Sequence, residues 1–307
     1  MPDAVRLLEA MGGAAATAAV VFLLFACPWR ATRPMGVAAG WTMSVGLGFA
    51  AGCRLLNVPL HWPPREDQDR FLLLVMPAVL GVELLAAVPR VWRGLILSLR
   101  IILAAAVAPV LLHGSVYLND PASADYWPPA RRGLILAGMA AALAIVWGLL
   151  ARLHRRAPGR SLPIALALTC AAAGVTVMLS GYLSGGQLTL PLAASLIGAA
   201  AASLVLSAAP NSTGWLGPGI VGLFGVLAMG RFFADLTTAH AFALFSAPLL
   251  GWLPELPGFR WLRLSLRGLA RVVLIAAAAL AVAAQAHEKS STPVSVSRAS
   301  ISRSSLK

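Results

Sequence analysis

A series of apolar runs, several of them about twenty residues long, constrains what this chain can fold into. A helix of that length rises about 30 Å, which is the thickness of the hydrocarbon core of a bilayer. Charged residues make up only 11% of the chain, whereas a soluble domain carries about 25%. The sequence therefore predicts an integral membrane protein.

The spans are predicted to be helices rather than strands of a barrel. Backbone groups in lipid must be hydrogen-bonded internally, which leaves helices and closed barrels as the two solutions. A barrel strand alternates polar and apolar side chains, but a run such as "ILAGMAAALAIVWGLLA", which begins at Ile135, has no polar face. The predicted fold class is an all-α polytopic bundle.

The runs predict about ten spans, or nine if the ninth is a re-entrant segment, because that run is short and contains Pro248. Together they form one transmembrane domain over residues 1–286, followed by a disordered, basic, Ser-rich tail over residues 287–307. The predicted spans are Leu8–Cys27, Met35–Cys53, Phe71–Val88, Gly94–His113, Gly133–Ala151, Leu162–Leu183, Leu188–Ala209, Gly219–Leu236, Ala239–Leu253 and Leu269–Ala286.

The orientation rests on the distribution of Lys and Arg between the loops. With the N-terminus outside, eleven basic residues lie in inner loops and seven outside, and the four in the tail bring the two sides level. The dense stretches "RLHRRAPGR" and "FRWLRLSLRGLAR" favour the N-out arrangement, which makes both of them cytoplasmic. The preference for Ala and for Arg over Lys suggests GC-rich coding and a bacterial inner membrane.

Glu83 and Arg100 are charged residues inside apolar runs. They lie eight or nine residues on either side of the turn "PRVWR", so an antiparallel hairpin places both roughly 12–13 Å from the turn. A charge in the membrane usually pairs with another or faces a wet cavity. We expect an ion pair that locks the hairpin, or an Arg100 that reaches to the headgroups; a substrate or proton role is the alternative.

A second polar group follows in "GRFFADLTTAHAF", where Arg231 and Asp235 are four residues apart and are predicted to share a helix face. His240 lies just beyond and titrates near neutral pH in ordinary surroundings. The segment is predicted to lie at the outer membrane boundary, where simple hydration competes with a proton relay as its explanation.

Small residues recur at helical spacing in two spans. Gly48 and Gly52 are four residues apart, and Gly219, Gly222 and Gly225 follow each other in "GIVGLFGVLAMG". Such residues allow helix backbones to approach closely. We expect tight packing within the chain, with a homo-oligomer face or a mobile helix as alternatives.

Familiar catalytic and nucleotide-binding motifs are absent from the sequence. It contains no P-loop, no dinucleotide fingerprint after a strand, no zinc-protease motif and no nucleophile elbow. The net charge of +13 is scattered over short loops, so lipid headgroups rather than nucleic acid are the expected partner. No cofactor or metal is predicted.

Three functions remain open. The first is a structural or assembly subunit that packs against other membrane proteins. The second is a small-solute permease that uses Glu83 and Arg100; about ten spans in about 300 residues is similar in size to the drug/metabolite transporter superfamily, although neither its motifs nor a five-plus-five repeat is present. The third is an intramembrane enzyme acting on a lipid-linked substrate through His113, Asp120 or Asp125.

Overall fold

The computed structural model describes residues 4–26, 34–118, 127–205, 213–256, 258 and 264–291. Every regular element in these ranges is a helix. In chain order they are α1 (Ala4–Ala26), α3 (Pro34–Leu55), α4 (Asp67–Arg70), the π-helical turn η1 (Phe71–Val75), α5 (Met76–Ala86), α6 (Arg93–Leu111), α8 (Pro129–Arg156), α9 (Ser161–Leu179), α10 (Leu183–Gln187), α11 (Thr189–Val205), α12 (Leu216–Phe233), α13 (Thr238–Ser246), the 3₁₀ helix η2 (Ala247–Glu255) and α14 (Leu264–Ser291).

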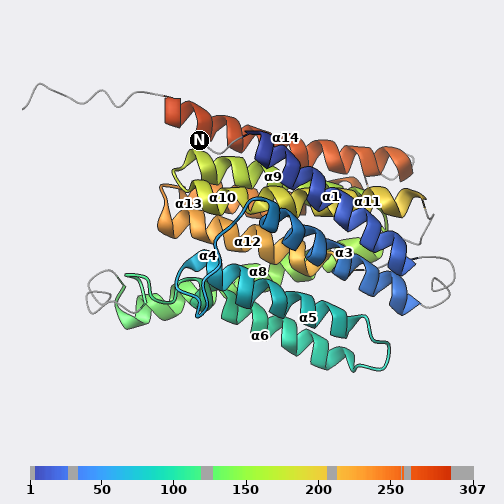
Figure 1. The fold of residues 1–307 in the computed structure, drawn as a ribbon, viewed down its shortest axis with the longest axis horizontal. Coiled ribbons are helices and arrows are strands. Elements are labelled where there is room, and N and C mark those ends of the chain that lie inside the picture. The colour runs from blue at the N-terminus through green and yellow to red at the C-terminus, as the bar shows by residue number, and fades with distance from the viewer. Residues whose placement is uncertain are drawn as a thin grey trace, which may run out of the picture.

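The helices form one bundle in which successive helices run back and forth along a common direction (Figure 1). Within the described ranges, eight helices are long and apolar enough to cross a membrane, and they coincide with eight of the ten predicted spans. The predicted spans Phe71–Val88 and Ala239–Leu253 are not among the eight, because neither forms a single long α-helix.

Proline explains both interruptions. Pro77 is the second residue of α5 and has no N–H to donate, and the helix widens into the π turn η1 just before it. Pro248 and Pro254 lie in the segment that follows α13, and there the chain winds as the tighter 3₁₀ helix η2. The helical path continues through each interruption.

The C-terminal helix extends beyond the predicted start of the tail. The tail was predicted to begin at residue 287, but α14 continues to Ser291, because "HEKS" contains residues that a helix accepts as it leaves the apolar region; residues 292–307 lie outside the described part. The loop after α9 turns at Gly181, whose φ is +96°. Gly185 and Gly186 follow in α10.

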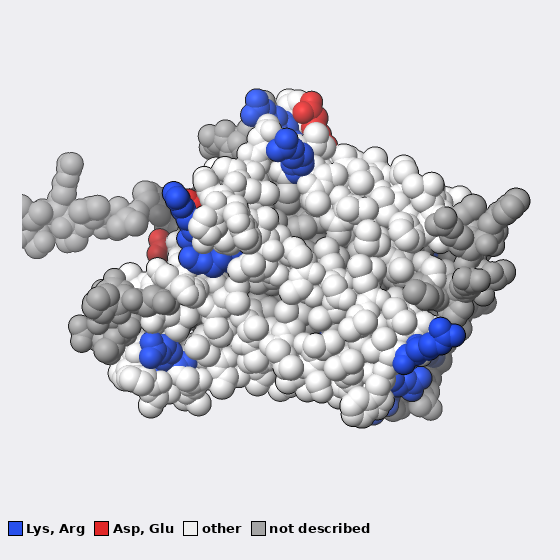
Figure 2. All heavy atoms as spheres, turned by 60° about the horizontal axis from the view of Figure 1, so that its bottom comes forward, with Lys and Arg blue, Asp and Glu red and all other residues white. Residues whose placement is uncertain are grey.

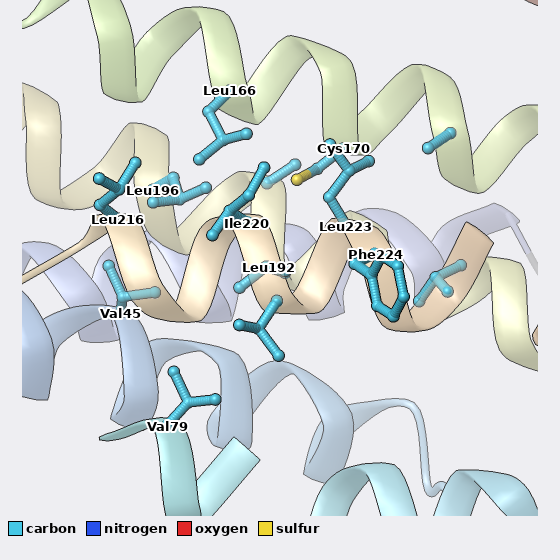
Figure 3. Close-up of a cluster of buried hydrophobic side chains, with 14 of the residues drawn as sticks. Val45, Val79, Leu166, Cys170, Leu192, Leu196, Leu216, Ile220, Leu223 and Phe224 are labelled. Carbon is cyan, nitrogen blue, oxygen red and sulfur yellow. The ribbon is translucent and has the colours of Figure 1, made fainter. Parts of the chain in front are cut away.

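The core is built around α12, in which every residue from Leu216 to Gly230 is buried. Figure 3 shows Ile220 and Leu223 of α12 pointing toward α9, which contributes Leu166 and Cys170 to the same cluster. The outer helices α1 and α14 pack against α11 and α9 respectively. Helices α9, α11 and α12 are thus the most buried of the long helices in the described ranges, whereas α6 and α8 are mostly exposed although they are the most apolar.

The glycines singled out from the sequence lie at close helix contacts. A Cβ on Gly48 would lie 2.7 Å from the carbonyl oxygen of Ala14 in α1, and one on Gly52 would lie 2.5 Å from Cβ of Pro191 in α11. Gly219, Gly222 and Gly225 face side chains of α9, α11 and η1 in turn: Leu166, Leu192 and Phe71. These contacts are all within one chain.

Candidate functional site

A groove of about 640 Å³ lies between α6 and α8, beside the loop that joins α5 to α6. We call it the arginine groove; its lining includes Arg93, Arg100, Arg155, Leu97, Ile101 and Trp147. Leu97 is 61% exposed and Ile101 is 51% exposed. The groove therefore has a basic part and an apolar rim on the outside of the bundle.

Arg100 joins the groove to the interior through the buried Glu83. Its Nε donates to Oε1 of Glu83 at 2.9 Å and its Nη2 donates to Oε2 at 2.7 Å. The Glu83 side chain is 1% exposed and that of Arg100 is 22% exposed. The structure thus brings the two predicted residues together in a two-pronged ion pair, the geometry for which the guanidinium fork is suited.

The local sequence explains how these residues meet. Helical side chains lean toward the N-terminus of their own helix, so Arg100, seven residues into α6, reaches back toward the α5–α6 turn. Glu83 lies three residues before the end of α5. Gly217 of α12 leaves the space that the carboxylate fills, since a Cβ there would lie 2.8 Å from Oε1 of Glu83.

The groove carries an excess of positive charge. Arg93, Arg100 and Arg155 line it, and Glu83 compensates only one of them through its bond to Arg100. The guanidinium carbon of Arg100 also lies 5.5 Å from the centre of the Trp147 ring, a cation–π contact that holds it in place. Two full positive charges remain at the mouth of a low-dielectric surface, an arrangement that attracts anions.

The second predicted group is not assembled as expected. Arg231 and Asp235 do not share a helix face, because α12 ends at Phe233 and Ala234 has an extended backbone. Arg231 donates from Nε to Oγ1 of Thr238 at 2.7 Å. Asp235 and His240 instead line a separate hollow of about 350 Å³ beside the α9–α10 turn.

A second buried ion pair was missed. Arg271 of α14 is 3% exposed and donates from Nη2 to Oε1 of Glu255 at 2.6 Å. Its other nitrogens donate to the hydroxyl of Ser161 at 2.5 Å and to the carbonyl of Gly251 at 3.2 Å. The sequence could have indicated this pair, because Arg271 is a charged residue inside the predicted span Leu269–Ala286. Arg100 is placed in the same way inside the predicted span Gly94–His113.

At the opposite end of the bundle a polar cluster joins α4 to the α9–α10 turn. The Tyr182 hydroxyl donates to Asp67 at 2.6 Å, and Gln68 donates to Ser184 at 2.5 Å. Burial by itself would raise the pKa of Asp69, but backbone N–H groups of the preceding loop, that of His61 first among them, outweigh it and hold this pKa below its ordinary value. The cluster fastens that loop to the bundle.

The structure describes only one of the three residues that the enzyme hypothesis uses. His113 is exposed, and its carbonyl accepts a hydrogen bond from Arg70. Asp120 and Asp125 lie outside the described residues. Within the described ranges no group of three or more His, Cys, Asp or Glu side chains is arranged to hold a metal ion.

No protein-family model, no curated protein and no solved structure matches the chain.

Proposed function

We propose that the chain is a multi-pass membrane protein in which all ten predicted segments cross the bilayer. From η1 to the end of α5 the chain is helical over residues 71–86, about 24 Å at 1.5 Å per residue, and the polar α4 precedes it. The nine residues of α13 and the nine of η2 together extend over roughly 32 Å. The second length matches the hydrocarbon core of about 30 Å, and the first approaches it.

The surface supports this placement. On the face shown in Figure 2, charged side chains gather toward the periphery and the broad middle is uncharged. Trp62 and Trp92, which are 79% and 76% exposed, belong to loops at opposite ends of α4–α5. Exposed tryptophans flanking an uncharged belt are typical of the two membrane interfaces. The basic loops next to α6, α8 and α9 then place the arginine groove at the cytoplasmic end.

Within that placement, the arginine groove is proposed to bind the phosphate of an anionic lipid headgroup. The observation that carries the proposal is that three arginines line one groove, that only Arg100 among them is paired with a carboxylate, and that the groove has an apolar rim at Leu97 and Ile101. Arginine forks bind phosphate oxygens in pairs, and basic pockets between helices on the cytoplasmic side are known to take lipid headgroups. The apolar rim would lie along an acyl chain.

In this proposal, Glu83 positions Arg100. Its bond to Arg100 holds the guanidinium at the inner end of the groove, while Arg93 and Arg155 remain without a carboxylate partner among the described residues. A lipid held between α6 and α8 would stabilise the packing of these two helices. The function is then that of a lipid-binding membrane subunit, rather than translocation of a solute past the ion pair.

The test is lipid-dependent thermal stability of the full-length protein in neutral detergent. A ligand that binds only the folded state stabilises it by RT ln(1 + [L]/Kd). We expect phosphatidic acid to raise the melting temperature and phosphatidylcholine to have little effect. Arg93→Gln combined with Arg155→Gln should weaken the apparent affinity for phosphatidic acid about tenfold or more, since two charge-assisted contacts are removed.

Gly148→Leu provides a second variant that leaves the arginines in place. Gly148 lines the groove and has open space around it, so leucine should fill the groove without a clash. The matched control is Gly133→Leu, which is on the same helix, has equally open surroundings and lies outside the groove. The proposal fails if both leucine variants retain the phosphatidic acid effect, or if inorganic phosphate alone reproduces it, because the ligand is then no lipid.

A further inference from the structure

A second hollow of about 510 Å³ lies at the other end of α8, where α8 faces α12 and α13. We call it the aromatic pocket; its lining includes Trp127, Phe224, Phe232, Phe242, Arg131 and Arg231. Phe242 is 65% exposed, so this wall is open to the outside of the bundle. The pocket shares no lining residue with the arginine groove.

The charges of the aromatic pocket lie at one end only. Arg131 is in the first turn of α8 and Arg231 is two residues before the end of α12, so both belong to helix ends on the outer side. From Arg131 the lining of α8 continues through Ile135 and Gly138 to Ala142, about 16 Å along the helix. The pocket is therefore an apolar channel with a basic mouth.

The basic mouth has no acidic partner among the described residues. Arg231 donates to the neutral hydroxyl of Thr238 at 2.7 Å, and its guanidinium carbon lies 5.8 Å from the centre of the Phe232 ring. No described carboxylate forms an ion pair with Arg231 or with Arg131. Two guanidinium groups at the level of the headgroups can together bind one anionic group of a ligand.

We propose that the aromatic pocket binds one long-chain fatty acid, with its carboxylate at Arg131 and Arg231 and its alkyl chain between α8 and α13. A methylene group fills about the volume of a water molecule in the liquid, roughly 30 Å³, so the pocket holds on the order of seventeen such groups. That volume suits one alkyl chain. The proposal rests on the membrane placement above but not on the arginine groove.

The experiment uses the full chain in phosphatidylcholine nanodiscs with a palmitate analogue that carries a diazirine near the end of its chain. After illumination, we expect saturable cross-links at the deep end of the pocket, to α8 near residues 138–142 and to α13 near residue 245. Unlabelled palmitate should compete, and hexadecanol, which lacks the charge, should compete at least about tenfold less well, as expected from the loss of one charge-assisted contact.

Gly138→Leu tests the chain site directly. Gly138 lines the pocket and has nothing near its Cβ position, so leucine should occupy the channel and reduce saturable labelling about tenfold, the effect of roughly 1.4 kcal/mol. Gly133→Leu, equally open but outside the pocket, should label like the wild type. Equal labelling of the two variants would overturn the proposal. So would competition by hexadecanol as strong as that by palmitate, or preferential competition by phosphatidic acid.

The two sites can fail separately. If the chain does not sit in a membrane as proposed, both lipid effects should be absent. If only the arginine groove is wrong, Gly148→Leu will leave the phosphatidic acid effect unchanged while Gly138→Leu still abolishes labelling by the palmitate analogue.

Discussion

Arg100→Gln should destabilise the folded protein strongly, by about 3–5 kcal/mol, the usual cost of removing one partner from a buried ion pair. The substitution leaves Glu83, whose side chain is 1% exposed, without its cation. Glu83→Gln should cost less, because Arg100 retains its contact with Trp147 and opens onto the groove. Thermal or denaturant unfolding in detergent measures both effects.

The double variant decides what the pair contributes. If Glu83 and Arg100 stabilise each other, the loss in the double variant will be clearly smaller than the sum of the two single losses, since the uncompensated charge has been removed. Additive losses would show that the two residues act independently. Single variants as stable as the wild type would mean that the charges are retained for something other than folding, which would revive the permease hypothesis.

Gly198→Ala is expected to have the second large effect, about 1–3 kcal/mol or more, because overpacking of a tight contact forces backbone movement. A Cβ on Gly198 of α11 would lie 2.7 Å from the Cα and 2.8 Å from the carbonyl carbon of Ala15 in α1, and closer still to its oxygen. Backbone atoms cannot rotate away as a side chain can. Helices α1 and α11 would have to separate along their contact.

Gly12→Ala is the matched control for this prediction. Gly12 is on α1, and nothing lies within 4 Å of its Cβ position. Alanine there should leave stability unchanged or raise it by up to about 1 kcal/mol, because glycine is a poor helix former. The unfolding midpoints of the two variants provide the comparison. Similar values for both would mean that the α1–α11 contact is less tight than described.

The approximate extent of the helices follows from the sequence because lipid allows few backbone solutions. Eight predicted spans coincide with long apolar helices. The π turn before Pro77 and the 3₁₀ helix after Ser246 were not anticipated, although proline marks both. The end of α12 carries no such mark: neither glycine nor proline follows Phe233, so Asp235 was wrongly placed on that helix.

The candidate site was only half visible in the sequence. Glu83 and Arg100 stand out because they belong to one hairpin with a short turn, so their depths can be compared along the chain. Arg155 comes from the far end of α8, and only the packing of α8 beside α6 brings it to the groove. Gly198 is hidden in the same way, since an Ala-rich run does not reveal which of its small residues meets α1.

Both proposed lipid sites require that the two ends of the bundle lie on opposite sides of a membrane, and cysteine accessibility tests this directly. Cys27, Cys53 and Cys170 would be replaced, and a single cysteine introduced either at Leu60 or at Arg90, exposed positions in the loops before α4 and after α5. In intact cells, a membrane-impermeant maleimide should label the residue-60 cysteine and label the residue-90 cysteine only after permeabilisation. Labelling of both positions from the same side would contradict the account.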